Sequence, residues 1–384
     1  MELREYCAYR NDRINSDELN THNYISTENL LPNKGGITEA TSIPTGNVVR
    51  YDKGNILISN IRPYFKKIWL ADKSGGCSAD VLCIQSNDKV TSKFLYYLLS
   101  QQSFFDYVMA GAKGCKMPRG DKSHIMEWNV NIPDIDEQKR IADFLSSLDD
   151  KIELNRQIND NLEQQAQALF KSWFVDFEPF KDGEFVDSEL GMIPKGWRVG
   201  KLSDIADVTM GQSPSGESYN ENGIGEIFYQ GRTEFGDRFP SIRLYTTAPN
   251  RMAESNSILL SVRAPVGDIN VALQKCCIGR GLAAINAIDN YYSFVFYTVK
   301  SMKKDFGVYN GEGTVFGSIN KDSLNNMSVI IPTDDIKSNF ENIVSKLDNE
   351  YRLNYNEIVN LSNLRDTLLP RLMSGELKIN DINC

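Results

Sequence analysis

Two long stretches of the chain repeat apolar residues at steps of three and four positions. The first stretch covers residues 135 to 174, and its repeating positions are Ile141, Leu145, Leu148, Ile152, Asn155, Ile158, Leu162, Ala166, Leu169 and Trp173. The second stretch begins near residue 336, and its positions are Ile336, Phe340, Ile343, Leu347, Tyr351, Asn354, Ile358, Leu361, Leu364, Leu368 and Leu372. Residues at this spacing share one face of an α-helix. Each stretch therefore predicts a long amphipathic helix whose apolar face needs a partner.

The two apolar faces can cover each other. An intramolecular two-helix coiled coil buries both, and the helices are expected to run antiparallel because the chain between them is their only connection. Forty helical residues, 135 to 174, span about 60 Å at about 1.5 Å per residue. This length approaches two turns of B-DNA at about 34 to 36 Å per turn. We therefore expect the helices to act as a rigid spacer.

Two asparagines interrupt the apolar positions of the helices. Asn155 and Asn354 fall at equivalent places in the two patterns. A polar residue buried in such a seam fixes the register of the helices at some cost in stability. The same spacing also allows each asparagine to face solvent, so the sequence leaves both arrangements open.

The rest of the chain has the pattern of short strands. Runs rich in β-branched residues, such as NILISNI, DVLCIQS, SILLSV and INVALQ, are bounded by glycine-rich loops. Short helices are expected at residues 91 to 111 and 290 to 307. The pattern predicts α/β (α+β) domains, each with a curved and largely antiparallel sheet.

The chain is a tandem repeat. LREYC at residue 3 matches LSDIA at 202, NILISNIRP at 55 matches SILLSVRAP at 257, and the stretch from Gly114 matches the stretch from Gly313. An offset of 199 residues then holds through both long helices. We predict two similar mixed domains related by a pseudo-twofold axis. The predicted segments are a first recognition domain, a central helix, a second recognition domain and a distal helix, at 1–131, 132–182, 183–330 and 331–384.

Charge is distributed unevenly along the chain. The formal net charge is −9, which by itself argues against a nucleic-acid partner. However, residues 132–190 carry −9 and residues 331–384 carry −3, whereas 1–131 and 191–330 carry +2 and +1. The acidic residues therefore lie on the helices, whose outer faces we expect to meet protein, and the two mixed domains stay free to approach phosphate.

Several classes of site find no support in the sequence. The start of the chain has no signal peptide pattern and no apolar run has the length of a membrane helix, so we expect a cytoplasmic protein with no membrane partner. Seven cysteines without a CxxC pair and only two histidines give no metal-ligand spacing, and structural thiols are expected.

Catalytic motifs are also missing. The sequence contains no GxxxxGK[ST], GxGxxG or HExxH pattern and no Asn-Pro-Pro-Tyr type motif for holding a flipped adenine. The carboxylate pairs at 149–150 and 334–335 are interpreted as solvated helix surface and helix-start charge. No catalytic residue is therefore predicted.

Two long motifs resemble a known family. The stretch NIPDIDEQKRIADFLSSLDDKIELNRQINDNLEQQAQALFKSWFVDFEPF, from residue 131, is similar to the central conserved region of type I restriction-modification specificity (HsdS) subunits. The stretch SELGMIPKGWRVGKLSDIADVTMGQSPSGESYN, from residue 188, resembles the start of their target-recognition domains. The resemblance covers nearly the whole chain, except that its first residues have no counterpart of IPKGW.

The resemblance implies a bacterial or archaeal protein that chooses a DNA site without catalysis of its own. Two modification subunits carrying S-adenosylmethionine would dock on the helices, and restriction subunits would bring ATP and Mg²⁺, so no cofactor is expected on this chain. The target would be double-stranded DNA with two half-sites separated by a gap. The alternatives are a stand-alone DNA methyltransferase or nuclease, which would need a cofactor site, and a coiled-coil scaffold with other binding domains.

Candidate DNA contacts in the first domain come from two segments. SNIRPYFKK offers residues able to read bases or bind phosphate, because Arg pairs with guanine and Asn with adenine, and surface salt bridges explain any one of them equally well. GAKGCKMPRGDK is the densest basic cluster and is expected to position phosphates. The candidates are Asn60, Arg62, Tyr64, Lys66 and Lys67, followed by Lys113, Lys116, Arg119 and Lys122.

In the second domain, Arg263 of SVRAPVGD is taken as the equivalent of the first segment. Two further stretches, MGQSPSGESYN and YQGRTEFGDR, resemble recognition loops of the family. They add the candidates Gln212, Ser213, Ser215, Gln230, Arg232 and Arg238.

Overall fold

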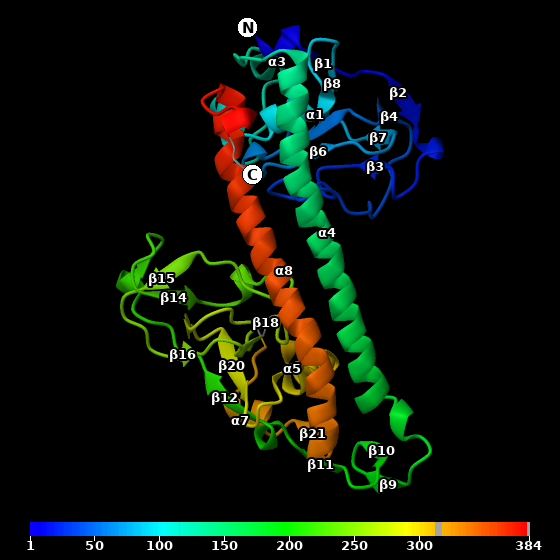
Figure 1. Cartoon of the computed structure of the whole chain (residues 1–384), viewed down its shortest axis with the longest axis vertical. Coiled ribbons are helices and arrows are strands. Elements are labelled where there is room, and N and C mark those ends of the chain that lie inside the picture. The colour runs from blue at the N-terminus through cyan, green and yellow to red at the C-terminus, as the bar shows by residue number, and fades with distance from the viewer. Residues whose placement is uncertain (115, 312–316, 382–384) are drawn as a thin grey trace. The chain divides into compact units, whose positions relative to one another are not determined.

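The computed structural model describes residues 1–114, 116–311 and 317–381. The chain divides into two compact units, one made of Met1–Arg156 with Asn356–Cys384 and the other of Gln157–Tyr355. Each unit combines a mixed domain of helices and strands with one part of each of two long helices (Figure 1). No helix in the described ranges has the length and apolar character needed to cross a membrane.

The first unit contains two small sheets. One has the order β1-β8-β5-β6 and is antiparallel throughout. The other has the order β2-β4-β7-β3, in which β3 runs parallel to β7. Their strands are β1 (Cys7–Tyr9), β2 (Arg13–Asn15), β3 (Tyr24–Ile25), β4 (Asn47–Tyr51), β5 (Ile56–Ser59), β6 (Ile68–Leu70), β7 (Gly75–Cys77) and β8 (Val81–Ser86).

Helices cover the first of these sheets. Two of them, α1 and α2, share one hydrophobic core with β5, β8 and the ends of both long helices. A side-chain cap begins α1, where Thr91 accepts a hydrogen bond from the Phe94 N–H at 3.3 Å. The helices of this unit are α1 (Ser92–Leu99), α2 (Gln102–Ala110), α3 (Lys122–Met126), η1 (Leu3–Glu5), η2 (Ser16–Glu18), η3 (Pro63–Phe65) and η9 (Ile379–Asp381).

The second unit repeats this topology. Its first sheet has the order β12-β20-β17-β18, and the β14-β19-β16 part of its second sheet reproduces β3-β7-β4, including the parallel pair. Two extra strands, β13 and β15, extend the second sheet. The strands are β12 (Ala206–Met210), β13 (Tyr219–Asn220), β14 (Glu226–Tyr229), β15 (Leu244–Thr246), β16 (Met252–Ala253), β17 (Ile258–Ser261), β18 (Ile269–Val271), β19 (Cys276–Ile278) and β20 (Leu282–Ala287).

Further elements of this unit lie at its helices and connections. β11 (Arg198–Lys201) pairs with β21 (Ser328–Ile331), and β9 (Phe185–Ser188) forms a hairpin with β10 (Gly191–Pro194). The helices are α5 (Tyr292–Ser301), α6 (Lys303–Gly307), α7 (Lys321–Asn325), η4 (Glu178–Phe180), η5 (Leu202–Asp204), η6 (Gly216–Ser218), η7 (Arg232–Glu234) and η8 (Val308–Asn310).

These observations confirm the internal repeat, the mixed fold and the predicted short helices. The pairing is largely antiparallel, as predicted. The expected single curved sheet is instead divided into two sheets in the first unit and four in the second, where β11–β21 and β9–β10 are the two small additional ones. The hairpin β9–β10 was not predicted, since its segment reads as a Pro- and Gly-containing connector.

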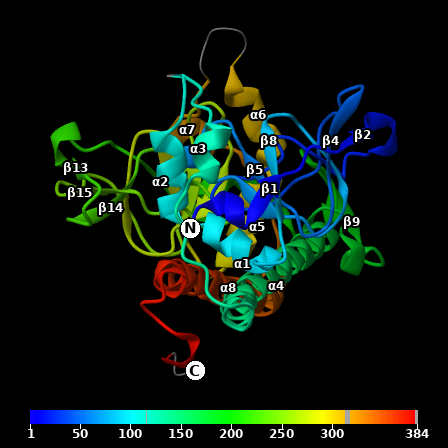
Figure 2. The ribbon, with the colours of Figure 1, turned by 90° about the horizontal axis from the view of Figure 1, so that it is seen from above.

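The two long helices are α4 (Ile135–Phe174) and α8 (Asp334–Ser374), and they pair antiparallel within each unit (Figures 1 and 2). In the first unit, Asp149 of α4 forms an ion pair with Arg365 of α8 at 2.6 Å. In the second unit, the rings of Phe170 and Phe340 lie 5.9 Å apart. Rising residue numbers on α4 therefore meet falling numbers on α8, and the antiparallel coiled coil is confirmed.

The apolar seam is narrower than the spacing predicted. Ile158, Ile343 and Leu364 were assigned to the seam, yet their exposed fractions are 37%, 45% and 45%. Asn155 and Asn354 are buried, at 0% and 7% exposure, so the solvent-facing alternative is wrong. The Asn354 amide donates to Asn159 Oδ1 at 3.1 Å, and the Asn155 amide donates to Glu357 Oε2 at 2.7 Å. Their role in fixing the register stays a prediction.

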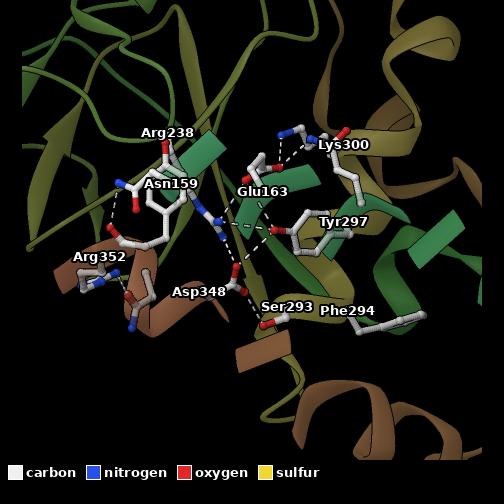
Figure 3. A network of polar contacts seen from close by, with 12 residues as sticks. Asn159, Glu163, Arg238, Ser293, Phe294, Tyr297, Lys300, Asp348 and Arg352 are labelled. Atoms are coloured by element: carbon white, nitrogen blue, oxygen red, sulfur yellow. Dashed lines mark hydrogen bonds and ion pairs between the residues drawn. The ribbon is translucent and has the colours of Figure 1, made fainter. Parts of the chain in front are cut away.

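A buried arginine attaches the second domain to both helices (Figure 3). Arg238, which is 8% exposed, donates to Glu163 Oε2 of α4 at 3.1 Å and to Asp348 Oδ1 of α8 at 2.6 Å. Its guanidinium lies 4.5 Å from the Phe296 ring centroid and 5.0 Å from that of Tyr351. Burial opposes ionisation of the Glu163 carboxyl, but the nearby Arg238 and Lys300 cations outweigh it and lower its pKa.

This burial corrects the assignment of Arg238 as a DNA contact. Both ends of the guanidinium are engaged by carboxylates, and aromatic rings cover its faces. A phosphate could reach it only by displacing these partners. The side chain therefore fixes the domain on the helices, and it is not available at the surface.

The first unit has a carboxylate at the helix position equivalent to Asp348, but a different arginine pairs with it. Asp149 is the repeat equivalent of Asp348 at the offset of 199, and it accepts a hydrogen bond from the Tyr97 hydroxyl at 2.7 Å, as Asp348 does from Tyr297 at 3.2 Å. The arginine that pairs with Asp149 is Arg365 of α8. The interpretation of Asp149 as solvated surface was therefore wrong.

We predict that Arg238→Ala destabilises the second unit by about 3 kcal/mol, because it leaves two carboxylates poorly solvated with their main cation removed. The measurement is the unfolding of the whole chain in denaturant, followed by near-UV circular dichroism. Arg232→Ala is the control, since its ion pair with Asp268 is half exposed and should change stability by less than about 1 kcal/mol. Equal effects of the two substitutions would contradict this role of Arg238.

Candidate nucleic-acid interface

The two predicted DNA-contact segments of the first unit meet at the end of β5. The Arg62 N–H donates to the Pro118 carbonyl at 2.8 Å, and the Gly120 N–H donates to the Asn60 carbonyl at 3.2 Å. An isolated bridge also joins Ile61 to Arg119. These backbone bonds bring the two segments, whose bonded residues are 56 to 60 positions apart in the sequence, onto one surface.

The basic side chains on this surface differ in whether they form ion pairs. Lys113 pairs with Asp121 at 2.5 Å, and Arg119 pairs with Asp80 at 3.1 Å. Arg62 and Lys116 are exposed and form no ion pair with any residue that the structure describes. The unpaired cations are therefore the strongest candidates for contact with phosphate.

Asp121 serves both the helix and the lysine. It caps α3 by accepting the N–H groups of Ser123 at 2.9 Å and His124 at 3.3 Å. Its hydrogen bond from Lys113 and these backbone donors lower the pKa of its carboxyl to about 2. The same contact raises the pKa of Lys113. Lys113 thus stays charged but is already engaged.

The other five candidates of this unit differ in their availability to DNA. Lys67 is half-buried and donates to the Thr27 carbonyl at 2.6 Å, and burial lowers its pKa. Asn60 has a buried Oδ1 atom that lacks a hydrogen-bond partner among the described atoms. Lys122 is exposed, with its ammonium 5.7 Å from the Tyr9 ring centroid. Lys66 is half-buried and Tyr64 is exposed.

The second unit repeats the backbone arrangement at the end of β17. The Ala264 N–H donates to the Gly317 carbonyl at 3.0 Å, the Ile319 N–H donates to the Val262 carbonyl at 3.1 Å, and a bridge joins Arg263 to Ser318. By this register Arg263 corresponds to Ile61, and Ala264 corresponds to Arg62. The two arginines are therefore not equivalent, although both are exposed.

The turn between β19 and β20 gathers the other candidates of this unit. Ser213 Oγ accepts the Arg280 N–H at 3.3 Å, and the Gln212 N–H donates to the Ile278 carbonyl at 3.0 Å. A Cβ on Gly279 would lie 2.8 Å from the Gln230 carbonyl oxygen, so glycine allows this close approach. The Val262 N–H bonds to the Gly281 carbonyl at 3.0 Å and links this turn to the Arg263 loop.

Arg280 is a candidate that the sequence did not reveal. It is exposed at the tip of the turn, between Gly279 and Gly281, beside Gln212 and Ser213. A sequence pattern that could have indicated it is CIGRGL, in which glycines on both sides of the arginine are typical of a tight turn. Ser215 is exposed at the start of η6, and Arg232 is partly engaged by Asp268.

Each unit thus ends one strand of its first sheet in a loop that presents an exposed arginine, Arg62 in the first unit and Arg263 in the second. Such side chains can bind phosphate and read base edges. Two similar domains of this kind define a protein that can contact two DNA segments.

Comparisons with known proteins agree with this class. The family model described as the type I restriction modification DNA specificity domain matches residues 3–164 and 194–362. The MjaIX specificity subunit of a type I restriction enzyme from Methanocaldococcus jannaschii is 30% identical over 86% of this chain and 79% of its own length. The HindI specificity subunit of a type I restriction enzyme from Haemophilus influenzae is 26% identical over 92% of this chain and 94% of its own length.

A solved structure also shares the fold. The S subunit of a type I restriction-modification system from M. genitalium aligns with a TM-score of 0.60 at 19% identity, covering 97% of this chain and 95% of that one. The chain belongs to the family of type I restriction-modification DNA specificity proteins.

We predict that Lys116→Ala weakens binding of the assembled enzyme to target and non-target DNA by the same factor. The loss of one phosphate contact should also reduce the slope of log affinity against log salt by about 0.9. Fluorescence anisotropy at several salt concentrations measures both. Lys53→Ala is the matched control, because Lys53 is an exposed lysine just before β5, at the opposite end of that strand. An unchanged slope for Lys116→Ala would exclude a phosphate contact there.

Proposed function

We propose that each recognition domain of this specificity subunit reads one half-site of a bipartite double-stranded DNA target. The observation that carries the proposal is that one backbone arrangement occurs twice with different side chains. Ile61 and Arg62 at the end of β5 are replaced by Arg263 and Ala264 at the end of β17. A shared frame with exchanged side chains suits two readers of different sequence.

We propose that the two long helices set the gap between the half-sites. α4 and α8 have 40 and 41 residues, and each continues without interruption from one unit into the other. Hydrogen bonds and ring contacts hold the helices together in both units, as described for Asp149 and Phe170. A paired helical spacer resists bending better than a loop, and its length follows the residue count at about 1.5 Å per residue.

The outer faces of the helices fit a protein partner better than DNA. The two helices carry net charges of −3 and −2, which repel phosphate. They also expose large apolar side chains, namely Leu154, Ile158, Leu353, Val359 and Leu364. We propose that two modification subunits dock there, and that restriction subunits join the same complex.

The chemistry is proposed to lie on these partners. The modification subunits would bind S-adenosylmethionine, and the restriction subunits would bind ATP and Mg²⁺, while this chain would hold no cofactor and catalyse no step. The described residues contain no cluster of three His, Cys, Asp or Glu side chains that could hold a metal ion. The role of this chain is then to place the partners on the chosen sequence.

Methylome sequencing of strains with and without the gene tests this function. We expect the deletion to abolish one methylated motif, which consists of two short sequences separated by a constant unspecific gap. Restoring the gene on a plasmid should restore the same motif. A lost motif that is continuous, or a methylome that does not change, would contradict the proposal.

Purified components provide the control for catalysis. The chain alone, incubated with S-adenosylmethionine and DNA that contains the motif, should transfer no methyl groups, whereas adding the modification subunit should restore transfer. Methyl transfer by the chain alone would instead support the stand-alone methyltransferase.

A further inference from the structure

An exposed pair of aromatic residues stands at the DNA-facing end of β5. Tyr64 and Phe65 belong to the single turn η3 and are 47% and 38% exposed. Their ring centroids lie 4.7 Å apart with planes inclined by 54°. Adjacent exposed aromatic side chains form an apolar surface patch, and such patches are typical of binding sites.

The backbone that carries the pair is held rigidly. Arg62 and Lys66, on either side of η3, have left-handed φ angles of 50° and 51°, which side chains disfavour. Asn33 and Lys34, which are also left-handed, bond to this turn through their backbone. The Asn33 N–H donates to the Phe65 carbonyl at 2.8 Å, and the Lys34 N–H donates to the Lys66 carbonyl at 3.0 Å. Strained residues persist when their surroundings fix them. The rings therefore sit on a preformed projection.

The residues around the projection formed by Tyr64 and Phe65 indicate what kind of partner it could bind. The exposed Arg62 directly precedes it, and the Arg62 N–H bonds to the Pro118 carbonyl, which lies in the basic segment of Lys116 and Arg119. Met117, which is 50% exposed, adds a third apolar side chain. An apolar tip among cations matches a polyanion that also offers flat apolar faces. Double-stranded DNA combines phosphates with stacked bases in this way.

The second unit provides an internal comparison. The turn between β17 and β18 is one residue shorter than the turn between β5 and β6, and it carries Val266, which is 6% exposed, and Gly267 in place of the aromatic pair. The two turns also differ in backbone, because residues 262–268 form no 3₁₀ turn like η3. The exposed aromatic pair is therefore a feature of the first domain and not of the shared frame.

We propose that Tyr64 and Phe65 form a wedge that enters the first half-site and separates two neighbouring base pairs. This proposal rests on the proposed function, since it assumes that the first domain reads a half-site. Apolar side chains inserted at a base step unstack it and bend the duplex, and pyrimidine–purine steps yield most easily. The wedge would make the first half-site sensitive to the deformability of the step as well as to base identity.

The test uses the assembled modification enzyme and duplexes that carry the motif found by methylome sequencing. The probe 2-aminopurine, whose fluorescence rises when it loses its stacking neighbours, replaces one base at a time in both half-sites. The methylated adenines and the bases next to them are excluded, because flipping of the adenine would unstack these bases without a wedge. We expect the wild-type complex to raise the fluorescence at one step of the first half-site and at no step of the second. The double variant Tyr64→Ala/Phe65→Ala should abolish this rise and lower affinity on the order of tenfold.

Two variants separate a wedge from a merely structural role. Phe65→Leu with Tyr64→Phe keeps an apolar tip and should retain the rise, and size-exclusion chromatography checks that every variant still assembles. A wild-type complex without any rise would overturn the wedge, and so would a rise that survives in the alanine variant. Sequence-specific methylation that persists in such a case would show that only the wedge has failed, whereas its absence in the wild type would refute the proposed function.

Discussion

The pairing of α4 with α8 is the constraint on which the rest of the structure depends. Neither helix can bury its apolar face alone, and each unit contains one part of both helices. Each domain is then attached at one repeated carboxylate by a tyrosine, Tyr97 on Asp149 in the first unit and Tyr297 on Asp348 in the second. In the second unit Arg238 adds an ion pair from the domain to Asp348. The attachment orients a domain on helices whose own geometry is fixed. Reading loops on such a domain can be placed accurately.

The duplication explains how one fold can serve two sequences. Both domains end a central strand with the same set of backbone hydrogen bonds, and these bonds do not depend on side-chain identity. Side chains on this frame are thus free to diverge, as the contrast between Arg62 and Ala264 shows. The arginine at the repeated carboxylate has diverged as well, since Arg365 belongs to α8 and joins the two helices, whereas Arg238 comes from the domain. A common frame with local differences is what a bipartite reader requires.

The features that could be predicted are those that leave a regular spacing in the sequence, namely the long helices and the repeat. The three-and-four spacing predicted residues 135–174 as one helix, and α4 has these bounds, while the constant offset predicted the repeat. Long-range side-chain contacts leave no such pattern. Arg238 looked like a loop arginine, because its partners lie 75 and 110 positions away. Left-handed residues such as Arg62 and the exposed Arg280 depend on tertiary contacts that local propensity does not encode.

The central claim is that the paired helices measure the distance between two half-sites. The most direct test inserts seven residues into each helix, next to Arg156 in α4 and next to Asn356 in α8, so that the seam stays in register. Seven residues add about 10.5 Å, or about three base pairs at about 3.4 Å each. Methylome sequencing should then find both half-sites unchanged and the gap about three base pairs longer. Methylation that keeps the original gap would contradict the account.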